Sequence, residues 1–319
     1  MTTKELDALY VAPTYGRFPV EIVRGEGSLV WDENGKEYID MGTGIAVNTF
    51  GLADPAWIAA VTAQLGRFQH TSNLYYTAPC AELARMLCEA TGMKKVFFGN
   101  SGAEANECAI KAARKYSQDK YGPERYEIIT LKNSFHGRTL TTLAATGQDV
   151  FHEKFTPLTP GFLYADPADP AGLEALVKDH AVAAVMFEAV QGEGGVLPLP
   201  ADFVEAMKRI AAENDILLIA DEVQVGNGRS GALYGYMNLG LAPDIVTTAK
   251  GLGGGLPIGA CMLGEKVQDV LGPGDHGSTF GGNPATCAGA VSILSRLTEE
   301  VLAGVRERSD YITRSLACA

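Results

Sequence analysis

A lysine stands between an apolar run and a glycine-rich loop in the stretch Thr247-Thr248-Ala249-Lys250-Gly251-Leu252-Gly253-Gly254-Gly255-Leu256-Pro257. Asp221 directly follows a second apolar run, residues 216–220. If both runs are buried strands, an amine and a carboxylate lie at two strand ends. Such a pair suits a carbonyl cofactor with a basic ring nitrogen, because the amine can form a Schiff base and the carboxylate can hold the ring proton, as pyridoxal phosphate requires. Lys250 and Asp221 are therefore the candidate catalytic residues.

The composition disfavours nucleic acid and membrane as partners. With 319 residues, 46% of them hydrophobic, the chain can bury a large core and form one big domain plus a smaller one. A formal net charge of −12 without any polybasic stripe disfavours nucleic-acid binding. No stretch approaches the roughly 20 apolar residues of a membrane helix. Residues 1–7 are polar and acidic, which argues against a signal or transit peptide.

The cysteines favour a cytoplasmic location. There are six, at positions 80, 88, 108, 261, 287 and 318, mostly in apolar contexts and without any Cys-x-x-Cys spacing. Buried free thiols in a reducing compartment explain this pattern better than a disulfide framework or a zinc site. We expect no metal site.

Helix and strand patterns alternate from about residue 80 onward. The predicted strands are the apolar runs 95–98, 127–131, 183–188, 216–221, 245–249 and 258–263. Helical patterns lie between them, for example over residues 81–90, 104–117, 173–180 and 202–213. This alternation predicts an α/β fold with a mostly parallel sheet covered by helices on both faces. Ligands of such sheets bind beyond the carboxyl ends of the strands, where Asp221 and Lys250 are expected.

The two ends of the chain have a different character. Residues 28–40 are predicted to form two short strands around an Asn34-Gly35 turn. Residues 291–319 show apolar positions at roughly helical spacing and are predicted to be helical. An apolar helix face needs a cover, so we expect either a partner subunit there or a chain that is cut short.

A phosphate site is indicated at residues 100–106, which follow the strand 95–98. Ser101 and Glu104 have the spacing of a capping box, and alanines mark one face of the helix that follows. A strand, a glycine turn and an open helix N-terminus can bind phosphate through backbone N–H groups. Taken alone, the stretch is better interpreted as an ordinary capped helix. The nearby lysine and aspartate motifs favour the phosphate interpretation.

Further polar and aromatic residues follow other strands. Phe135 could stack on a pyridine ring, Arg138 could hold a carboxylate through two parallel hydrogen bonds, and His136 could neighbour a cofactor. The alternatives are a buried phenylalanine, a surface arginine and a packed polar histidine.

Two loops could complete the pocket. Glu188 and Glu193 lie just past a strand among glycines that permit close backbone approach, and Glu193 could regulate access to a cationic group or be a solvated loop acid. Ser278 and Thr279 carry hydroxyls that could reach a phosphate, although their segment alone reads as a loop.

Six motifs in this order resemble the class III, ornithine-type aminotransferases of fold type I, which depend on pyridoxal 5′-phosphate. They are residues 100–106, 135–139, 188–195, 221–224, 249–260 and 277–284. The resemblance runs from about Tyr15 to the end of the chain.

The resemblance implies a role for each motif residue at the cofactor. Lys250 is implied to carry it covalently and to move a proton, Asp221 to keep its ring nitrogen protonated, and Gln224 to contact its phenolic oxygen. Val223 and Phe135 are implied to pack on opposite ring faces. The implied cofactor-binding set is completed by Ser101, Gly102, Ala103, His136, Glu188 and, from a second subunit, Thr279.

The resemblance also implies a substrate pocket and a homodimer with shared active sites. Arg138 matches an arginine that holds a substrate carboxylate, and Tyr15 and Ser278 are implied to line the same pocket. Glu193 matches a glutamate that masks a second arginine in related enzymes.

Three departures from the family pattern stand out. The stretch Gly51-Leu52-Ala53-Asp54-Pro55 lacks both histidines of the family's Gly-His-x-His-Pro, and Val225 and Asn227 replace a threonine and a small apolar residue. The chain is also expected to lack most of a C-terminal domain. On this basis, residues 1–48 belong to a small domain, 49–298 form the large cofactor-binding domain, and 299–319 begin the incomplete C-terminal part.

The implied reaction transfers the terminal amino group of N-acetylornithine to 2-oxoglutarate, giving N-acetylglutamate semialdehyde and glutamate, as in arginine biosynthesis. Alternative donors are ornithine, succinylornithine, succinyl-diaminopimelate and 4-aminobutyrate. A cofactor-binding fragment without turnover is the non-enzyme alternative. An aminomutase or racemase is disfavoured because Arg138 and Glu193 suit a two-substrate pocket. A dinucleotide-binding protein is disfavoured because no Gly-x-Gly-x-x-Gly follows the first strand.

Overall fold

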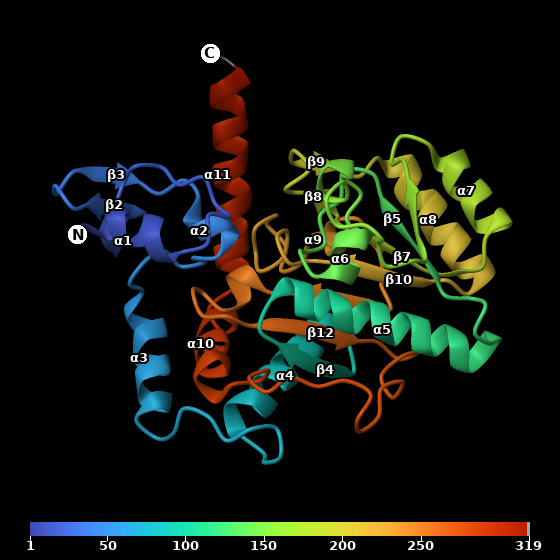
Figure 1. Cartoon of the computed structure of the whole chain (residues 1–319), viewed down its shortest axis with the longest axis horizontal. Helices are drawn as coiled ribbons and strands as arrows, with labels where there is room; N and C mark the ends of the chain where they lie inside the picture. The colour runs from blue at the N-terminus through green and yellow to red at the C-terminus, as the bar shows by residue number, and fades with distance from the viewer. Residues whose placement is uncertain (318–319) are drawn as a thin grey trace.

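A seven-stranded sheet forms the centre of the protein, as the computed structural model describes it for residues 1–317 (Figure 1). Its strand order is β4-β12-β11-β10-β7-β5-β6, and β12 alone runs antiparallel to its neighbours. The strands are β4 (Lys95–Gly99), β5 (Glu127–Leu131), β6 (Phe162–Ala165), β7 (Val182–Phe187), β10 (Leu217–Asp221), β11 (Ile245–Thr248) and β12 (Gly259–Leu263). The predicted mostly parallel sheet is confirmed, and β6 is an additional strand.

Helices cover both faces of this sheet, and each face has its own hydrophobic core. In β10, Leu217 and Ile219 face one core while Leu218 and Ala220 face the other, as the two-residue period of a strand requires. Helix α5 (Gly102–Tyr121) packs on the first face mainly through alanines. The opposite face is covered by α4 (Ala78–Thr91), α7 (Pro170–Asp179), α8 (Ala201–Asn214) and α10 (Pro284–Leu294).

The predicted N-terminal strand pair is confirmed. It belongs to a three-stranded antiparallel sheet of β1 (Ile22–Glu26), β2 (Leu29–Asp32) and β3 (Glu37–Ile39). Gly35 takes a φ of +77° in the turn between β2 and β3, a conformation that glycine adopts without strain. Asp32 stabilises this turn by accepting hydrogen bonds from the N–H groups of Asn34 and Lys36, both at 2.9 Å.

The remaining elements are short or lie near the chain ends. They are α1 (Thr3–Tyr10), α2 (Thr43–Ala46), α3 (Pro55–Leu65), α6 (Leu140–Ala145), α9 (Gly235–Asn238), α11 (Glu299–Ala317), the strand pair β8 (Val190–Gln191) and β9 (Leu197–Pro198), and the 3₁₀ turns η1 (Asp149–Phe151) and η2 (Lys250–Leu252).

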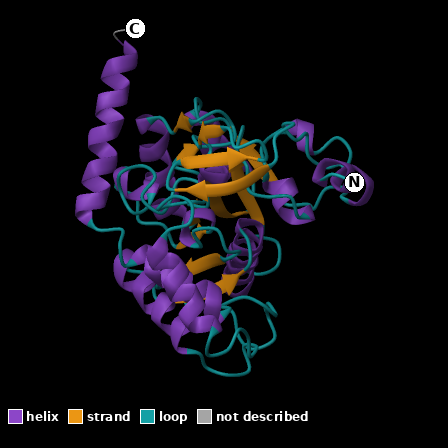
Figure 2. Ribbon diagram, turned by 90° about the vertical axis from the view of Figure 1, so that its left-hand side faces the viewer, coloured by secondary structure: helices purple, strands orange, loops and turns teal. Residues whose placement is uncertain are grey.

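The helical prediction for residues 291–319 is confirmed over 291–294 and 299–317, but it missed a break between two helices at residues 295–298. Helix α10 ends at Leu294, and α11 begins at Glu299 after four intervening residues. Thr298 starts the new helix, because its hydroxyl accepts a hydrogen bond from the Val301 N–H at 3.4 Å. Helix α11 then projects from the body of the protein (Figures 1 and 2). Residues 318 and 319, including Cys318, lie outside the described part.

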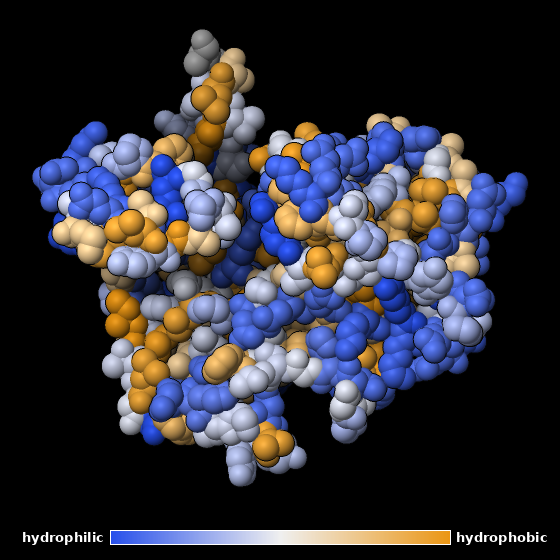
Figure 3. Space-filling model, viewed as in Figure 1, coloured by the Kyte–Doolittle hydropathy of each residue, from blue (hydrophilic) through white to orange (hydrophobic). Residues whose placement is uncertain are grey.

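The other five cysteines are free thiols, as predicted: Cys108, Cys261 and Cys287 are buried, and Cys80 and Cys88 are partly buried. Among residues 1–317, no helix combines the length and hydrophobicity needed to span a membrane. Large exposed hydrophobic side chains are concentrated in the first 76 residues, for example Phe18, Met41, Leu74 and Tyr76. In the view of Figure 3, part of this hydrophobic surface lies over the N-terminal elements.

The departure at residues 51–55 has a structural role. Asp54 caps α3 by accepting a hydrogen bond from the Trp57 N–H at 2.8 Å. The same carboxylate receives two hydrogen bonds from the Arg296 guanidinium, at 2.8 and 3.0 Å. The hydrogen bonds from Arg296 lower the pKa of Asp54. An aspartate before Pro55 therefore joins α3 to the end of α10.

Candidate active site

A cavity of about 420 Å³ opens beyond the carboxyl ends of β10 and β11, next to the N-terminus of α5. Asp221 ends β10, and Lys250 lies two residues past β11. The register pairs Asp221 with Thr247, so the aspartate and the lysine come from adjacent strands. The cavity wall contains eleven predicted site residues: Ser101, Gly102, Ala103, Phe135, His136, Arg138, Glu188, Asp221, Val223, Gln224 and Lys250.

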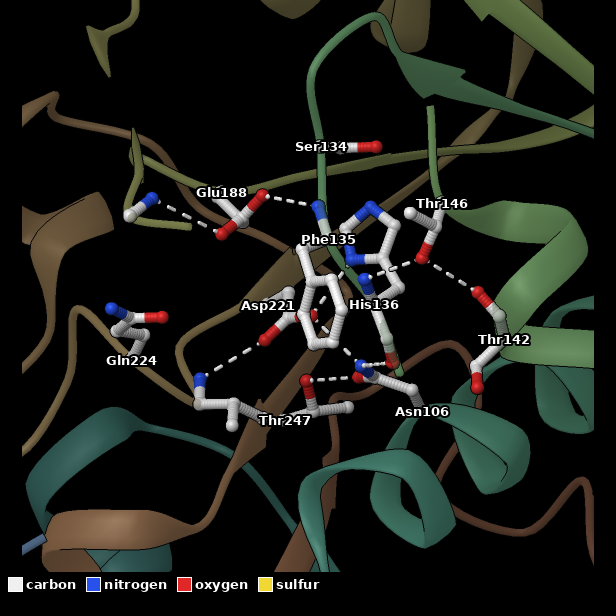
Figure 4. Close-up of polar contacts among 12 residues, drawn as sticks. Asn106, Ser134, Phe135, His136, Thr142, Thr146, Glu188, Asp221, Gln224 and Thr247 are labelled. Carbon is white, nitrogen blue, oxygen red and sulfur yellow. Dashed lines mark hydrogen bonds and ion pairs between the residues drawn. The ribbon is translucent and has the colours of Figure 1, made fainter. Parts of the chain in front are cut away.

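Asp221 is held by three hydrogen-bond donors although it is only 3% exposed. Its Oδ2 accepts from His136 Nδ1 at 2.7 Å and from Asn106 Nδ2 at 2.8 Å, and its Oδ1 accepts from the Val223 N–H at 3.0 Å (Figure 4). Burial disfavours the charged form of His136, but the hydrogen bond and charge of Asp221 outweigh it and raise the pKa of His136. Asp221 thus favours the protonated form of His136.

Three polar residues of this network, Asn106, Thr247 and Thr146, were not predicted. Asn106 Nδ2 also donates to the His136 carbonyl at 2.8 Å, and Asn106 Oδ1 accepts from the Thr247 hydroxyl at 2.6 Å (Figure 4). Thr146 accepts a hydrogen bond from the His136 N–H at 3.0 Å. The sequence signal that could have revealed Asn106 is a single amide on the alanine-rich face of a predicted helix. Such a face is buried, and a buried polar group needs a hydrogen-bond partner.

Lys250 is partly buried and conformationally strained. Its φ is +44°, which is unfavourable for a residue with a side chain. Its Nζ donates to Gln224 Oε1 at 3.0 Å. Burial lowers the pKa of Lys250, with the charge of Asp221 opposing the shift. A larger fraction of the amine is therefore neutral than in an exposed lysine.

The N-terminus of α5 can bind an anion. Ser101 caps the helix by accepting a hydrogen bond from the Glu104 N–H at 3.2 Å. The predicted capping box is only half formed, because the Glu104 carboxylate accepts from the Asn100 N–H at 2.6 Å instead of from Ser101. The first-turn N–H groups of a helix have no intrahelical acceptor, and within the described residues Gly102 N–H makes no backbone hydrogen bond.

Gly102 could not be replaced by a larger residue without moving its neighbour. A Cβ at this position would lie 2.6 Å from Val223 Cγ1. Because Gly102 has no side chain, the start of α5 packs against the loop that follows β10. The anion site and Asp221 therefore lie in one cavity.

Aromatic and charged groups form the opposite wall. Phe135 packs edge-on against Phe151 at a centroid distance of 5.7 Å, and the Arg138 guanidinium lies 4.6 Å from the Phe151 centroid. Glu188 is 3% exposed and accepts hydrogen bonds from the N–H groups of Phe135 and Gly192, at 3.0 and 3.4 Å. Burial raises the pKa of Glu188 to about 7.

Four predicted site residues lie outside the cavity wall. Tyr15 is 75% exposed in the N-terminal segment. Ser278 Oγ accepts from Asn100 Nδ2 at 3.1 Å, and Thr279 is exposed beside it. Glu193 is exposed and accepts a hydrogen bond from Gln148 Nε2 at 2.6 Å. Their predicted roles remain predictions.

Comparison with known proteins identifies the family. The class-III aminotransferase family model matches residues 10–318. This chain belongs to the class-III aminotransferases. A relative, the acetylornithine aminotransferase of Haemophilus ducreyi, is 50% identical over 313 residues, which are 98% of this chain and 80% of that protein. The succinylornithine transaminase of Salmonella paratyphi A is 47% identical over 315 residues, 98% of this chain and 77% of that protein.

A solved structure supports the fold of this class-III aminotransferase. The N-acetylornithine aminotransferase from Stenotrophomonas maltophilia matches it with a TM-score of 0.82 and 38% identity, over 98% of this chain and 76% of that one. The expected family and fold type I architecture are thereby confirmed. Class-III aminotransferases depend on pyridoxal 5′-phosphate.

The residues of this class-III aminotransferase fit that cofactor. The cavity brings together an amine for the aldehyde, a buried carboxylate for the ring nitrogen and an open helix N-terminus for the phosphate. Within residues 1–317, no cluster of three or more metal-ligating side chains is present.

The raised pKa of Glu188 predicts a pH effect on stability. The carboxyl titrates near 4.5 when unfolded and near 7 when folded, so between these values the folded protein holds a proton that the unfolded chain has lost. The free energy of unfolding should therefore fall in this window as pH rises. Glu188→Gln lacks this titration, so wild type should lose stability relative to the variant between pH 5 and pH 8.

Denaturant unfolding of the cofactor-free protein at both pH values measures this difference. Glu193→Gln, at an exposed loop position, is the control and should differ from wild type equally at the two pH values. If the difference in free energy of unfolding between wild type and Glu188→Gln were the same at both pH values, Glu188 would already be ionised at pH 5.

Proposed function

We propose that this enzyme transfers the terminal amino group of N-acetylornithine to 2-oxoglutarate, with pyridoxal 5′-phosphate as cofactor. The principal support is the placement of Lys250 and Asp221 at adjacent strand ends facing one cavity. The choice of donor is supported by the acetylornithine aminotransferase of H. ducreyi, which is 50% identical to this chain over 313 residues.

Each cavity wall would hold a different part of the cofactor. Backbone N–H groups of Gly102 and Ala103, next to Ser101, would bind the phosphate, while Val223 and Phe135 would contact the ring faces. Further polar contacts would come from His136, Glu188 and, at the phenolic oxygen, Gln224. When bound, the cofactor supplies an aldehyde that carries the amino group and a ring that withdraws electrons.

Lys250 would act as the general base. Its Nζ would take a proton from the amine-bearing carbon of the donor, which requires the neutral amine. The burial that lowers the pKa of Lys250 increases the neutral fraction. Asp221 would hold the proton of the ring nitrogen, and its own charge is stabilised by the donors from His136 and Asn106.

A homodimer with shared active sites is part of the proposal. Thr279 is exposed outside this cavity, in a position to serve a second subunit, and exposed hydrophobic residues such as Leu74 and Tyr76 would be covered in an interface. Tyr15 and Ser278 would line the assembled substrate pocket. Sedimentation equilibrium should give twice the chain mass, and a monomer would contradict the dimer.

Residues 1–48 and those from 299 onward would belong to a smaller domain beside the large domain of residues 49–298. A cytoplasmic location is proposed for the enzyme. Glu193 would regulate access to a second carboxylate site, in a position held by its hydrogen bond from Gln148.

A panel of amino donors tests the reaction. Holoenzyme is mixed with N-acetylornithine, N-succinylornithine, ornithine or 4-aminobutyrate, and the change in cofactor absorbance and the glutamate formed from 2-oxoglutarate are measured. N-acetylornithine should give the highest kcat/KM. A preference for N-succinylornithine would favour the second candidate function, which the 47% identical Salmonella relative supports.

Lys250→Ala should abolish both the visible absorbance of the bound cofactor and turnover, because no amine remains to carry it. Cofactor absorbance in wild type without reaction with any donor would contradict the aminotransferase reaction.

Arg138→Lys should raise the KM for 2-oxoglutarate about tenfold or more, because lysine cannot form two parallel hydrogen bonds to a carboxylate. Steady-state kinetics at fixed donor concentration measures this. Arg85→Lys is the control, since Arg85 pairs with Glu82 on the surface of α4. An unchanged KM for 2-oxoglutarate in Arg138→Lys would show that Arg138 does not hold the substrate carboxylate.

A further inference from the structure

Asn106 is a buried side-chain amide. Both of its N–H groups donate hydrogen bonds, and one of the two lone pairs of its oxygen accepts one. Asn106 lies on the sheet-facing side of α5 and is 1% exposed. Its Nδ2 donates to Asp221 Oδ2 and to the His136 carbonyl, both at 2.8 Å, and its Oδ1 accepts from Thr247 Oγ1 at 2.6 Å (Figure 4). One side chain of α5 therefore connects β10, β11 and the loop that carries His136.

The orientation of this amide is determined by its neighbours. A carboxylate and a carbonyl can only accept hydrogen bonds, so the two groups beside Asn106 both require the NH₂ end of the amide. The oxygen end must then face Thr247, whose hydroxyl donates. The reversed amide would place its oxygen against Asp221 Oδ2 and remove a hydrogen-bond donor from both buried acceptors.

The same contacts restrict Asp221. A carboxylate has about four acceptor positions. His136 and Asn106 occupy both positions on Oδ2, and the Val223 N–H occupies one on Oδ1. Among the described residues no further donor to Asp221 is present, so one position on Oδ1 remains, on a side chain that lines the cavity. A single N–H of a ligand ring would fill this position.

We propose that Asn106 and Thr247 are positioning residues that hold the Asp221 carboxylate in the rotation needed to bind the protonated ring nitrogen. This inference rests on the proposed cofactor. Thr247 fixes the orientation of Asn106, and Asn106 fixes both the Asp221 oxygen and the backbone of His136. The alternative is a purely structural tie between α5 and the sheet, which would affect folding but not the ring contact specifically.

Matched variants at position 247 separate these roles. Thr247→Val keeps the side-chain shape and removes the hydroxyl, whereas Thr247→Ser keeps the hydroxyl. The dissociation constant is measured by absorbance titration of the cofactor-free protein with pyridoxal 5′-phosphate. The same titration uses the analogue in which a C–H group replaces the ring nitrogen. The analogue keeps the aldehyde and phosphate but cannot donate to Asp221.

Thr247→Val should bind pyridoxal 5′-phosphate about fivefold more weakly than wild type, the effect of about one net hydrogen bond. Its affinity for the analogue should equal that of wild type, and Thr247→Ser should bind both like wild type. Asn106→Ala should show a larger, similarly selective loss. Thermal unfolding of each cofactor-free variant establishes that it is folded, and the Val/Ser pair decides the question if Asn106→Ala does not fold.

Equal losses for the two ligands in Thr247→Val would show a general structural role and overturn the inference. Unchanged affinity for both would overturn it as well, while leaving the proposed function intact. If wild type bound pyridoxal 5′-phosphate no better than the Lys250→Ala variant, the proposed function itself would fail.

Discussion

A carboxylate buried at the carboxyl end of a parallel sheet is the constraint on which this site depends. Burying a charge is costly unless hydrogen bonds and an opposite charge replace the lost water. At Asp221 these are supplied by His136, Asn106 and the Val223 N–H, which come from three separate segments of the chain. The loop after β5, the start of α5 and the turn after β10 are therefore held together by one negative group.

The pairing of β10 with β11 brings Lys250 to the same cavity as Asp221. Because Asp221 pairs with Thr247 in register, the residues just past β11 reach the same edge of the sheet. Lys250 reaches its place with a φ of +44°, so the surrounding packing maintains a conformation that the residue alone would avoid. The buried glycine Gly251 follows directly, with Thr49 Oγ1 2.9 Å from where a Cβ would lie, so the turn after Lys250 is tightly packed.

Sequence patterns predicted six of the seven strands of the central sheet and the residues at their ends, since apolar runs and strand-end polar groups are local signals. They did not predict the roles of Asn106 and Thr247, because each lies inside a regular element and its partners are distant in the chain. The break before Glu299 was missed because apolar spacing continues across it, although Thr298 followed by two acids is a helix-start pattern. Long-range packing, which no local pattern encodes, places Tyr15 and Ser278 outside the cavity wall.

The alanine face of α5 has a consequence for cofactor recognition. Small side chains let the helix lie close against the sheet, where it cannot slide without losing contact along most of its length. Gly102 at its start and Asn106 four residues later are about 6 Å apart along the axis, at 1.5 Å per residue. A single rigid rod thus sets the spacing between the helix N-terminus and the buried carboxylate, and a ligand that contacted both would have to match this span between its phosphate and its heterocyclic nitrogen.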